Sequence, residues 1–355
     1  MVTAELLCKT DVFLISIIFG FNCSRISEPL VYEIIPWLNC FFLRIEIKVM
    51  KTHLLTLQDF TRSQLQAFLD RALVLKKEAR ENKRHQQLAG RTLCMLFDKP
   101  STRTRVSFES AMYKMGGQVI FMSAKETQLG RGEPLKDTAR VLARYVDGIV
   151  VRTFGQEVVE ELARYSDVPV INALTDLHHP CQILSDVMTV IEKKGAPEDL
   201  KIVWLGDGNN MANSLIQAAS VLGFPLTLAC PEGYEPDLKI LQAAQEHSSQ
   251  PINVLRDPAE AVAGADVINV DVWASMGQED EASMRLDIFR PYQLNADLLA
   301  RAAADAVVLH CLPAHREEEI TEDVLEGSQC IAFDQAENKM HMHKAILEYI
   351  INGIN

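Results

Sequence analysis

The stretch RTLCMLFDKPSTRTRVSFE, residues 91–109, passes from a strand pattern to a helix pattern through a polar corner. Residues 91–97 are almost continuously apolar, which is typical of a strand that is covered on both faces of a sheet. Pro100 ends this run, and an amphipathic helix pattern follows it. The apolar positions of that helix, which we expect to face the core, are Val106, Phe108, Met112 and Met115. The stretch therefore predicts a strand–loop–helix unit of an α/β fold.

The same alternation of strand and helix patterns continues along the chain in two series. The further β-rich runs of the first series are residues 117–123, 146–154 and 168–174. Those of the second series are residues 200–206, 225–230, 251–256, 265–273 and 305–313. We expect an α/β protein of two domains, each a mostly parallel sheet flanked by helices, joined by long helices.

Long helical patterns indicate how these domains are connected. Thr61 is expected to cap a helix within residues 57–79, and a helix that ends near Gly195 is expected to bridge the two domains. A last helix, about residues 336–351, is expected to pack back on the first domain. The predicted domain ranges are residues 50–190, completed by residues 336–355, and residues 191–335.

Residues 1–49 differ from the rest of the chain. They contain three of the eight cysteines, Cys8, Cys23 and Cys40, and two irregular apolar runs. Neither run reaches the roughly 20 residues that a membrane-spanning helix needs. A secretory signal peptide is not indicated, because acidic residues flank Lys9 and no small-residue cleavage site follows. We therefore expect an atypical extension outside the fold, with Met50 as the working start.

Composition limits the partners of the protein. The formal net charge is −13, whereas a nucleic acid or an anionic membrane requires a basic surface. The eight cysteines form no C-x-x-C pair and no metal-ligand spacing, so neither a disulfide framework nor a metal site is expected. We predict a cytoplasmic protein with reduced thiols, without a metal, a nucleic-acid partner or a membrane partner.

The corner at residues 101–104 has the chemistry of an anion site. A helix N-terminus at the carboxyl end of a strand offers unpaired N–H groups and the positive end of the helix dipole. The hydroxyls of this corner add donors, and Arg103 adds a planar fork suited to phosphate oxygens. Arg152 ends another strand and is a further donor. Because no P-loop lysine signature is present, we predict a small phosphate rather than a nucleoside triphosphate.

A second strand end carries His179 and Gln182. Pro180 is well suited to the first position of a helix, so both side chains are expected in or just before its first turn. A histidine beside a helix start and a glutamine is a candidate to polarise a carbonyl group. In the second series, Gly206 and Gly208 match only part of a dinucleotide fingerprint, and Asn209-Asn210 could instead bind a small substrate's carboxylate or ammonium.

Two further strand ends carry groups that could handle a proton. Asp271 precedes a Ser275-Met276-Gly277 turn, which is expected to close over a substrate. Cys311 lies between His310 and Pro313 at the end of the last strand. A free cysteine is usually buried and inert, so its role depends on this position.

In order along the chain, the motifs STRTR, HPCQ, DGNN, DVWASMG and HCLP resemble those of the aspartate/ornithine carbamoyltransferase family, from about Met50 to Asn355. The resemblance implies transfer of the carbamoyl group of carbamoyl phosphate to the side-chain amine of L-ornithine. The products are L-citrulline and phosphate, and the amine attacks directly through a tetrahedral intermediate without a cofactor. Aspartate, N-acetylornithine and putrescine are the rival acceptors.

The resemblance also implies site residues, position by position. The phosphate of carbamoyl phosphate is expected to contact Ser101, Thr102, Arg103, Thr104 and Arg152. Residues expected around the rest of carbamoyl phosphate are His179, Gln182, Cys311, Leu312 and Lys339. Residues expected to bind ornithine are Asn210, Asp271, Ser275 and Met276, with Asn209 as a second candidate. Gln128 is expected to reach the carbamoyl phosphate of a neighbouring subunit, which implies a homotrimer with shared active sites.

The implied catalytic groups are Arg103, His179, Asp271 and Cys311. Arg103 and His179 are expected to stabilise the oxyanion, and Asp271 with Cys311 to orient the amine and relay its proton. Lys339 departs from the family, which usually has an arginine there, so weaker carbamoyl phosphate binding is expected. Two alternatives lie outside this class. One is a nicotinamide dehydrogenase that would use Glu232 to bind the ribose, and the other is a non-catalytic paralogue. The sequence leaves open whether the reaction runs toward citrulline or backward.

Overall fold

The computed structural model describes residues 52–353 except 124–126, 129, 131 and 275–281. The extension expected at residues 1–49 lies outside the described residues, as does the turn of Ser275, Met276 and Gly277. Within the described part, no helix combines the length and the apolar run needed to cross a bilayer.

The first sheet has four parallel strands in the order β2-β1-β3-β4. These are β1 (Thr92–Phe97), β2 (Gln118–Ser123), β3 (Gly148–Arg152) and β4 (Val170–Leu174). The connecting helices are α4 (Thr102–Lys114), α5 (Leu135–Leu142) and α6 (Gln156–Tyr165). Alternate residues of β1 enter two different cores, Leu93 and Met95 on one face, Cys94 and Leu96 on the other. Burial on both faces explains why residues 91–97 show no polar alternation.

The second sheet has five parallel strands in the order β7-β6-β5-β8-β9. They are β5 (Ile202–Leu205), β6 (Leu226–Ala229), β7 (Ile252–Leu255), β8 (Val267–Val270) and β9 (Val307–His310). Its helices are α8 (Asn210–Leu222), α9 (Leu238–His247), α10 (Pro258–Val262), α11 (Ala282–Phe289), α12 (Ala296–Leu299) and α13 (Glu322–Leu325). Short 3₁₀ helices are η2 (Leu57–Asp59), η5 (Pro197–Asp199) and η7 (Arg290–Tyr292). The prediction of two parallel α/β sheets is confirmed.

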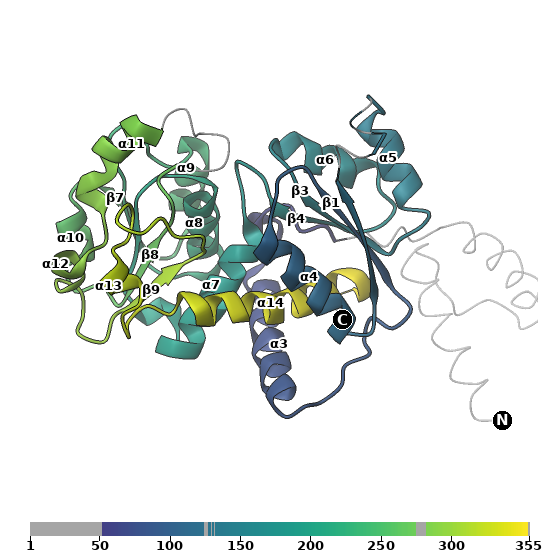
Figure 1. Cartoon of the computed structure of the whole chain (residues 1–355), viewed down its shortest axis with the longest axis horizontal. Coiled ribbons are helices and arrows are strands. Elements are labelled where there is room, and N and C mark those ends of the chain that lie inside the picture. The colour runs from purple at the N-terminus through teal and green to yellow at the C-terminus, as the bar shows by residue number, and fades with distance from the viewer. Residues whose placement is uncertain (1–51, 124–126, 129, 131, 275–281, 354–355) are drawn as a thin grey trace, which may run out of the picture. The chain divides into compact units, whose positions relative to one another are not determined.

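Three long helices pack together beside the sheets: α3 (Arg62–Arg80), α7 (Pro180–Lys194) and α14 (Ala332–Asn352). Thr61 caps α3 as expected, because its Oγ1 accepts the backbone N–H of Gln64 at 3.3 Å. Gly195 ends α7 with φ +94°, a conformation that favours glycine. Figure 1 shows α14 running along α7, and it contacts α3, α4 and β9 as well. It begins at Ala332, a turn earlier than expected.

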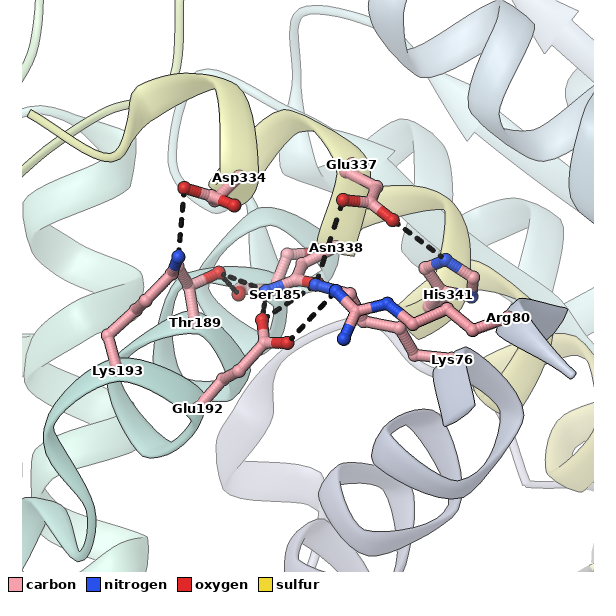
Figure 2. A network of polar contacts seen from close by, with 10 residues as sticks. All are labelled: Lys76, Arg80, Ser185, Thr189, Glu192, Lys193, Asp334, Glu337, Asn338 and His341. Carbon is pink, nitrogen blue, oxygen red and sulfur yellow. Dashed lines mark hydrogen bonds and ion pairs between the residues drawn. The ribbon is translucent and has the colours of Figure 1, made fainter. Parts of the chain in front are cut away.

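A network of polar side chains, with Lys76 and Asn338 buried at its centre, fastens α14 to its neighbours (Figure 2). Lys76 of α3 donates from Nζ to Glu192 Oε2 at 2.7 Å and to Asn338 Oδ1 at 2.6 Å. Asn338 in turn donates from Nδ2 to Thr189 Oγ1 at 3.0 Å and to Glu192 Oε2 at 2.9 Å. Because Asn338 is tied to both α3 and α7, the network sets the rotation of α14 about its axis.

The expectation that Val106 faces the core is wrong, since this side chain is 54% exposed. The buried face of α4 consists of Phe108, Ala111 and Met112, followed by Met115 at its C-cap. Val106 precedes Phe108 by two residues, which is roughly 200° around a helix, so it lies on the opposite side. Its hydrophobicity alone was a misleading signal.

Candidate active site

The carboxyl ends of both sheets meet at one cavity of about 780 Å³. In each sheet the strand order reverses, between β1 and β3 in the first and between β5 and β8 in the second. Loops that leave neighbouring strands in opposite directions open a crevice, where ligands bind in such folds. The predicted residues that line this cavity are Ser101, Thr102, Arg103, Thr104, Arg152, His179, Gln182, Asn209, Asn210, Asp271, Cys311, Leu312 and Lys339.

The N-terminus of α4 forms one wall of the cavity. Ser101 caps the helix by accepting the N–H of Thr104 on its Oγ at 3.2 Å. Thr104 is buried, and its Oγ1 lies 3.2 Å from Nζ of Lys339. Arg105 is directed elsewhere, since it pairs with Glu109 at 2.9 Å and stacks on Phe121. Of the two arginines in the corner, only Arg103 therefore lines the cavity.

Arg152 adds a buried positive charge to this wall. The register pairs it with Phe97, so the ends of β3 and β1 lie side by side. The side chain is buried, its Nε has no hydrogen-bond partner, and no carboxylate pairs with it among the described residues. Burial lowers the pKa of Arg152 to about 10, with Arg103 as a further lowering influence, but the group stays charged at neutral pH. A buried cation without a counter-ion favours an anionic ligand.

Lys339 reaches the same region from α14. Its Nζ donates to Gln182 Oε1 at 2.7 Å and lies 3.2 Å from Thr104 Oγ1, and both partners are uncharged oxygens. The side chain is buried, and burial lowers its pKa to about 8. At pH 7 it is still mainly an ammonium, and it adds a second positive charge to the wall.

His179 stands at the N-cap of α7, where its backbone N–H donates to Ser214 Oγ at 2.8 Å. Burial holds the pKa of its imidazole well below the usual value, and the positive charges of Lys339 and Arg152 act in the same direction. The ring is therefore neutral at physiological pH. A neutral imidazole that is directed into a cavity can donate one N–H to a carbonyl oxygen without acting as an acid.

Asp271 and Cys311 lie together at another part of the cavity lining. The register pairs Val270 with His310, so the next residue of each strand leaves the sheet beside the other. The Cys311 thiol donates to Asp271 Oδ1 at 3.0 Å, and Asn209 donates from Nδ2 to Asp271 Oδ2 at 2.9 Å. Burial raises the pKa of Cys311 well above its usual value, and the Asp271 charge adds to this. Cys311 is thus a thiol and hydrogen-bond donor at neutral pH, not a thiolate nucleophile.

The loop that carries Cys311 is supported by a buried pair. His310 Nδ1 accepts the backbone N–H of Leu312 at 2.9 Å, which leaves Nε2 as the donor to Glu319 Oε1 at 2.9 Å. Both side chains of the pair are almost fully buried. Asp271, His310 and Cys311 place ligand-type atoms within 4.8 Å of one another. Because both ring nitrogens and the thiol are used in hydrogen bonds, we assign no metal to this group.

The two asparagines of the acceptor side are positioned by the start of α8. Asn209 caps the helix by accepting the N–H of Met211 on Oδ1 at 2.9 Å, while its Nδ2 contacts Asp271. Asn210 donates from Nδ2 to the carbonyl of Thr175 at 2.6 Å, which links α8 to the end of β4. Gly208 is required before this cap, since a Cβ there would lie 2.2 Å from the carbonyl carbon of Glu235.

The structure adds residues to the cavity that the sequence patterns did not single out. Lys99 lines it, pairs with Asp176 and lies 4.1 Å from the centre of the Phe154 ring. Arg285 of α11 also lines it, and donates from Nη1 to Asp207 Oδ2 at 3.0 Å. Lys99 lies two residues before the STRTR motif and Asp207 belongs to the DGNN motif, so both could have been included. Arg285 stands in an ordinary helical pattern that carried no such signal.

One described residue of the expected site, Gln128, is not brought to this cavity, and two others lie outside the described residues. Gln128 is described but exposed, and it does not line the cavity. Ser275 and Met276 lie outside the described residues, so their expected contact with ornithine stays a prediction.

Comparison with known proteins matches the chain in two parts. Residues 52–192 match the model of the aspartate/ornithine carbamoyltransferase carbamoyl-P binding domain, and residues 198–350 match that of the Asp/Orn binding domain. An ornithine carbamoyltransferase of Desulfotalea psychrophila is 71% identical over 299 residues, covering 84% of this chain and 99% of that protein. One from Pelobacter propionicus is 54% identical over 304 residues, covering 86% and 100%. The solved ornithine carbamoyltransferase of Pyrococcus furiosus has a TM-score of 0.83 at 49% identity, covering 86% and 98%.

Proposed function

The chain belongs to the aspartate/ornithine carbamoyltransferase family, and from that premise we propose how its cavity performs carbamoyl transfer. The activity is transfer of the carbamoyl group of carbamoyl phosphate to the side-chain amine of L-ornithine, giving L-citrulline and phosphate. The proposal concerns the roles of the individual residues, the assembly and the location of the protein.

The observation that carries the proposal is that one cavity is lined by two groups of side chains with different chemistry, which we treat as its two walls. The first wall presents Arg103, Arg152 and Lys339, whose positive charges suit the phosphate of carbamoyl phosphate. The second wall presents Asp271 with its donor Cys311, which suit a primary amine. Two substrates bound against these walls would face each other across the cavity. Holding both in line supplies much of the rate enhancement of a two-substrate reaction.

In this mechanism the deprotonated side-chain amine of ornithine attacks the carbamoyl carbon. A new C–N bond forms, and the carbonyl oxygen becomes an oxyanion that the N–H of His179 and the donors of Arg103 and Thr104 stabilise. The oxyanion then re-forms the carbonyl and the bond to the phosphate oxygen breaks. Phosphate leaves against the cationic wall. The proton released by the attacking nitrogen passes to the Asp271–Cys311 pair or to the departing phosphate.

We further assign the remaining expected contacts. Residues 50–190, completed by residues 336–355, bind carbamoyl phosphate, and residues 191–335 bind ornithine, including Asn210 and the Ser275-Met276 turn. Gln128, exposed and away from the cavity of its own chain, suits a role in a neighbouring subunit of a homotrimer. A cytoplasmic location agrees with the free thiols of the five described cysteines.

The test is citrulline production by the full chain with carbamoyl phosphate and four parallel acceptors: ornithine, N-acetylornithine, putrescine and aspartate. We expect turnover with ornithine alone. Arg152→Ala should raise the Michaelis constant for carbamoyl phosphate. Asp271→Asn should impair the binding and reaction of ornithine. Turnover with another acceptor would overturn the assignment of the acceptor wall. If Arg152→Ala instead changed only the ornithine constant, the two walls would have been assigned the wrong way round.

A further inference from the structure

Asp186 is a buried carboxylate that lies beneath the cavity without lining it. It stands on α7, one turn after Gln182, and is 2% exposed. Three side-chain amides from three elements donate to it. These are Gln182 Nε2 to Oδ1 at 2.8 Å, Gln335 Nε2 to Oδ1 at 2.6 Å, and Asn269 Nδ2 to Oδ2 at 3.4 Å. A wholly buried acid with only neutral amide donors is costly, so its retention calls for a reason.

The contacts of Gln182 allow only one orientation of its amide group. An ionised carboxylate can only accept hydrogen bonds, and a lysine ammonium can only donate them. Asp186 at one end therefore requires the Nε2 group of Gln182, and Lys339 at the other end requires its Oε1. The oxygen of Gln182 is thus directed toward Lys339, and both residues line the cavity. A carbonyl oxygen has two lone pairs, and Lys339 uses one of them.

The same reasoning applies to Gln335 on α14. Its Nε2 donates to Asp186, and its Oε1 accepts the backbone N–H of His310 at 2.9 Å. His310 immediately precedes Cys311. Asn269, the third donor, lies on β8 two residues before Asp271 and therefore on the same side of the sheet. One carboxylate thus connects the carbamoyl side of the cavity with both strand ends of the acceptor side.

We propose that Asp186 is a positioning residue that fixes the amide of Gln182 with its oxygen toward the cavity, and thereby sets the preference for a carbamoyl donor over other acyl phosphates. The inference rests on the proposed function, since it assigns the carbamoyl group to the side of the cavity near Gln182. A carbamoyl group carries an amino group with two N–H donors, whereas an acetyl group has a methyl in that position. Only the carbamoyl group gains from an acceptor oxygen there. With the amide reversed, Nε2 would face both the ammonium of Lys339 and the substrate amino group, donor against donor.

Asp186 is ionised under ordinary conditions. Burial raises its pKa to about 6, while the three amide hydrogen bonds and the charge of Lys339 oppose that rise. Above pH 6 the carboxylate can only accept, so both glutamines are held in one orientation. Once protonated, it gains a donor, and it no longer distinguishes the two orientations of either glutamine.

The experiment compares Asp186→Asn with the parent chain, using two ligands of the same charge, carbamoyl phosphate and acetyl phosphate. Dissociation constants come from calorimetry at pH 7.5. We expect the asparagine variant to bind carbamoyl phosphate roughly 10- to 100-fold more weakly, as for a site that loses a hydrogen-bond acceptor. Binding of acetyl phosphate should change less than about twofold, because its methyl group makes no use of Gln182. Equal loss for both ligands would overturn the proposal, since it would mean general damage to the cavity.

A matched control and a double-mutant cycle sharpen this test. Ser185 is the neighbour of Asp186 on the same buried helix, and its hydroxyl donates within the helix to the carbonyl of Cys181 at 2.8 Å. Ser185→Ala should leave the ratio of the two dissociation constants unchanged. Gln182→Leu should abolish the preference by itself, and adding Asp186→Asn to it should have no further effect on the ratio. A further loss in the double variant would show that Asp186 does not act through Gln182.

If Asp186→Asn fails to fold, the pH dependence of the parent chain answers the same question. The ionisable groups that face Asp186 are Lys339 of α14 and the Cys311 thiol after β9. Between pH 5 and 7 the thiol does not titrate, and Lys339, whose pKa is lowered to about 8, stays mainly protonated. The preference for carbamoyl phosphate over acetyl phosphate should fall as pH decreases through 6. A constant ratio across that range would contradict the proposal. Citrulline formation by the parent chain is scored separately, so failure of the proposed function is distinguishable from failure of this inference.

Discussion

At the scale of single residues, Lys339 is a position at which we expect this cavity to depart from its family. Its ammonium contacts Thr104 and Gln182, two uncharged oxygens, and lies near the guanidinium of Arg152. A lysine supplies a point charge, whereas an arginine supplies the same charge on a planar fork with several donors. The difference should therefore appear in phosphate binding and leave the acceptor wall unaffected.

We expect Lys339→Arg to lower the dissociation constant of carbamoyl phosphate by about 3- to 10-fold, because the fork can bind two phosphate oxygens at once. The Michaelis constant for ornithine should stay within twofold of the parent value. Initial-rate kinetics with each substrate varied in turn measure both quantities. An unchanged or weaker affinity for carbamoyl phosphate would show that the pocket cannot accommodate the larger group productively.

The pH dependence of carbamoyl phosphate binding is a second prediction at this scale. Burial lowers the pKa of Lys339 to about 8, so the free enzyme loses this positive charge as pH rises above 8. Affinity for the anionic substrate should then fall by up to tenfold per pH unit between about pH 8.5 and 9.5. In Lys339→Arg the same range should be flat, since arginine stays protonated. Calorimetric titration of both proteins from pH 7 to 9.5 would refute the assignment if their profiles coincided.

At the scale of secondary structure elements, α14 is held in position by polar contacts as well as by its apolar face. The network of Figure 2 joins it to α3 and α7 through Lys76, Glu192 and Asn338. Asn338 is adjacent to Lys339, so an error in the rotation of α14 would move the ammonium away from Gln182. The network therefore links helix packing directly to the phosphate wall.

Lys76→Met tests this link. The Lys76 side chain is 3% exposed and Glu192 is 21% exposed, so removing the cation leaves a partly buried carboxylate short of its partner. We expect a loss of about 2 kcal/mol in the free energy of unfolding, or roughly 4–8 °C in the melting temperature. The dissociation constant of carbamoyl phosphate should rise as well.

The control for this prediction is an ion pair on the surface. Arg62 pairs with Glu198 at 2.6 Å, but the two side chains are 55% and 39% exposed. Arg62→Met should cost less than about 0.5 kcal/mol, because surface pairs contribute little. Thermal denaturation of both variants measures the two changes in melting temperature. Equal changes would contradict a special role of the α14 network.

At the scale of the whole molecule, the active site depends on more than one sheet and, in our proposal, on more than one chain. The cavity requires strand ends from both sheets, yet Gln128 lies outside it. A trimer with shared sites makes a direct prediction for mixed assemblies. Gln128→Ala and Arg103→Ala should each be nearly inactive alone. When the two are refolded together, hybrid trimers should recover part of the activity, because some interfaces would carry both intact residues.

The recovered activity should grow with mixing time and depend on the ratio of the two variants. The control is each variant taken through the same refolding procedure alone. If activity never exceeded the sum of the separate variants, although exchange of subunits was demonstrated, Gln128 would have to act elsewhere or not at all.

Local patterns allowed most of the fold to be predicted. Each strand of the two sheets lies within a run of apolar, β-rich residues. In the inner strands, such as β1 and β3, this run reflects burial of both strand faces. Thr61 and Gly195 were readable for the same reason, because helix ends depend on a few neighbouring residues. Val106 was misread, since a hydrophobic residue by itself does not say which side of a helix is covered.

The candidate site was predictable where a motif coincided with a strand end, and not elsewhere. Arg103, His179, Asp271 and Cys311 stand at such ends and line one cavity. Arg285 and Asp186 stand inside helices, where a charged residue looks the same whether it faces solvent or a buried partner. Only their contacts in the folded chain, with Asp207 and with three amides, mark them as part of the site's support.

The sequence by itself determined the class of fold, the order of the strands along the chain and the family's chemistry, because apolar periodicity, helix caps and short motifs are properties of neighbouring residues. Tertiary structure decided which strand ends became neighbours. The pairing of Val270 with His310 brings Asp271 to Cys311, and the packing of α14 on α7 brings Lys339 to Gln182. These are contacts between residues far apart in the chain, and they arise only when separate elements bury their apolar faces together.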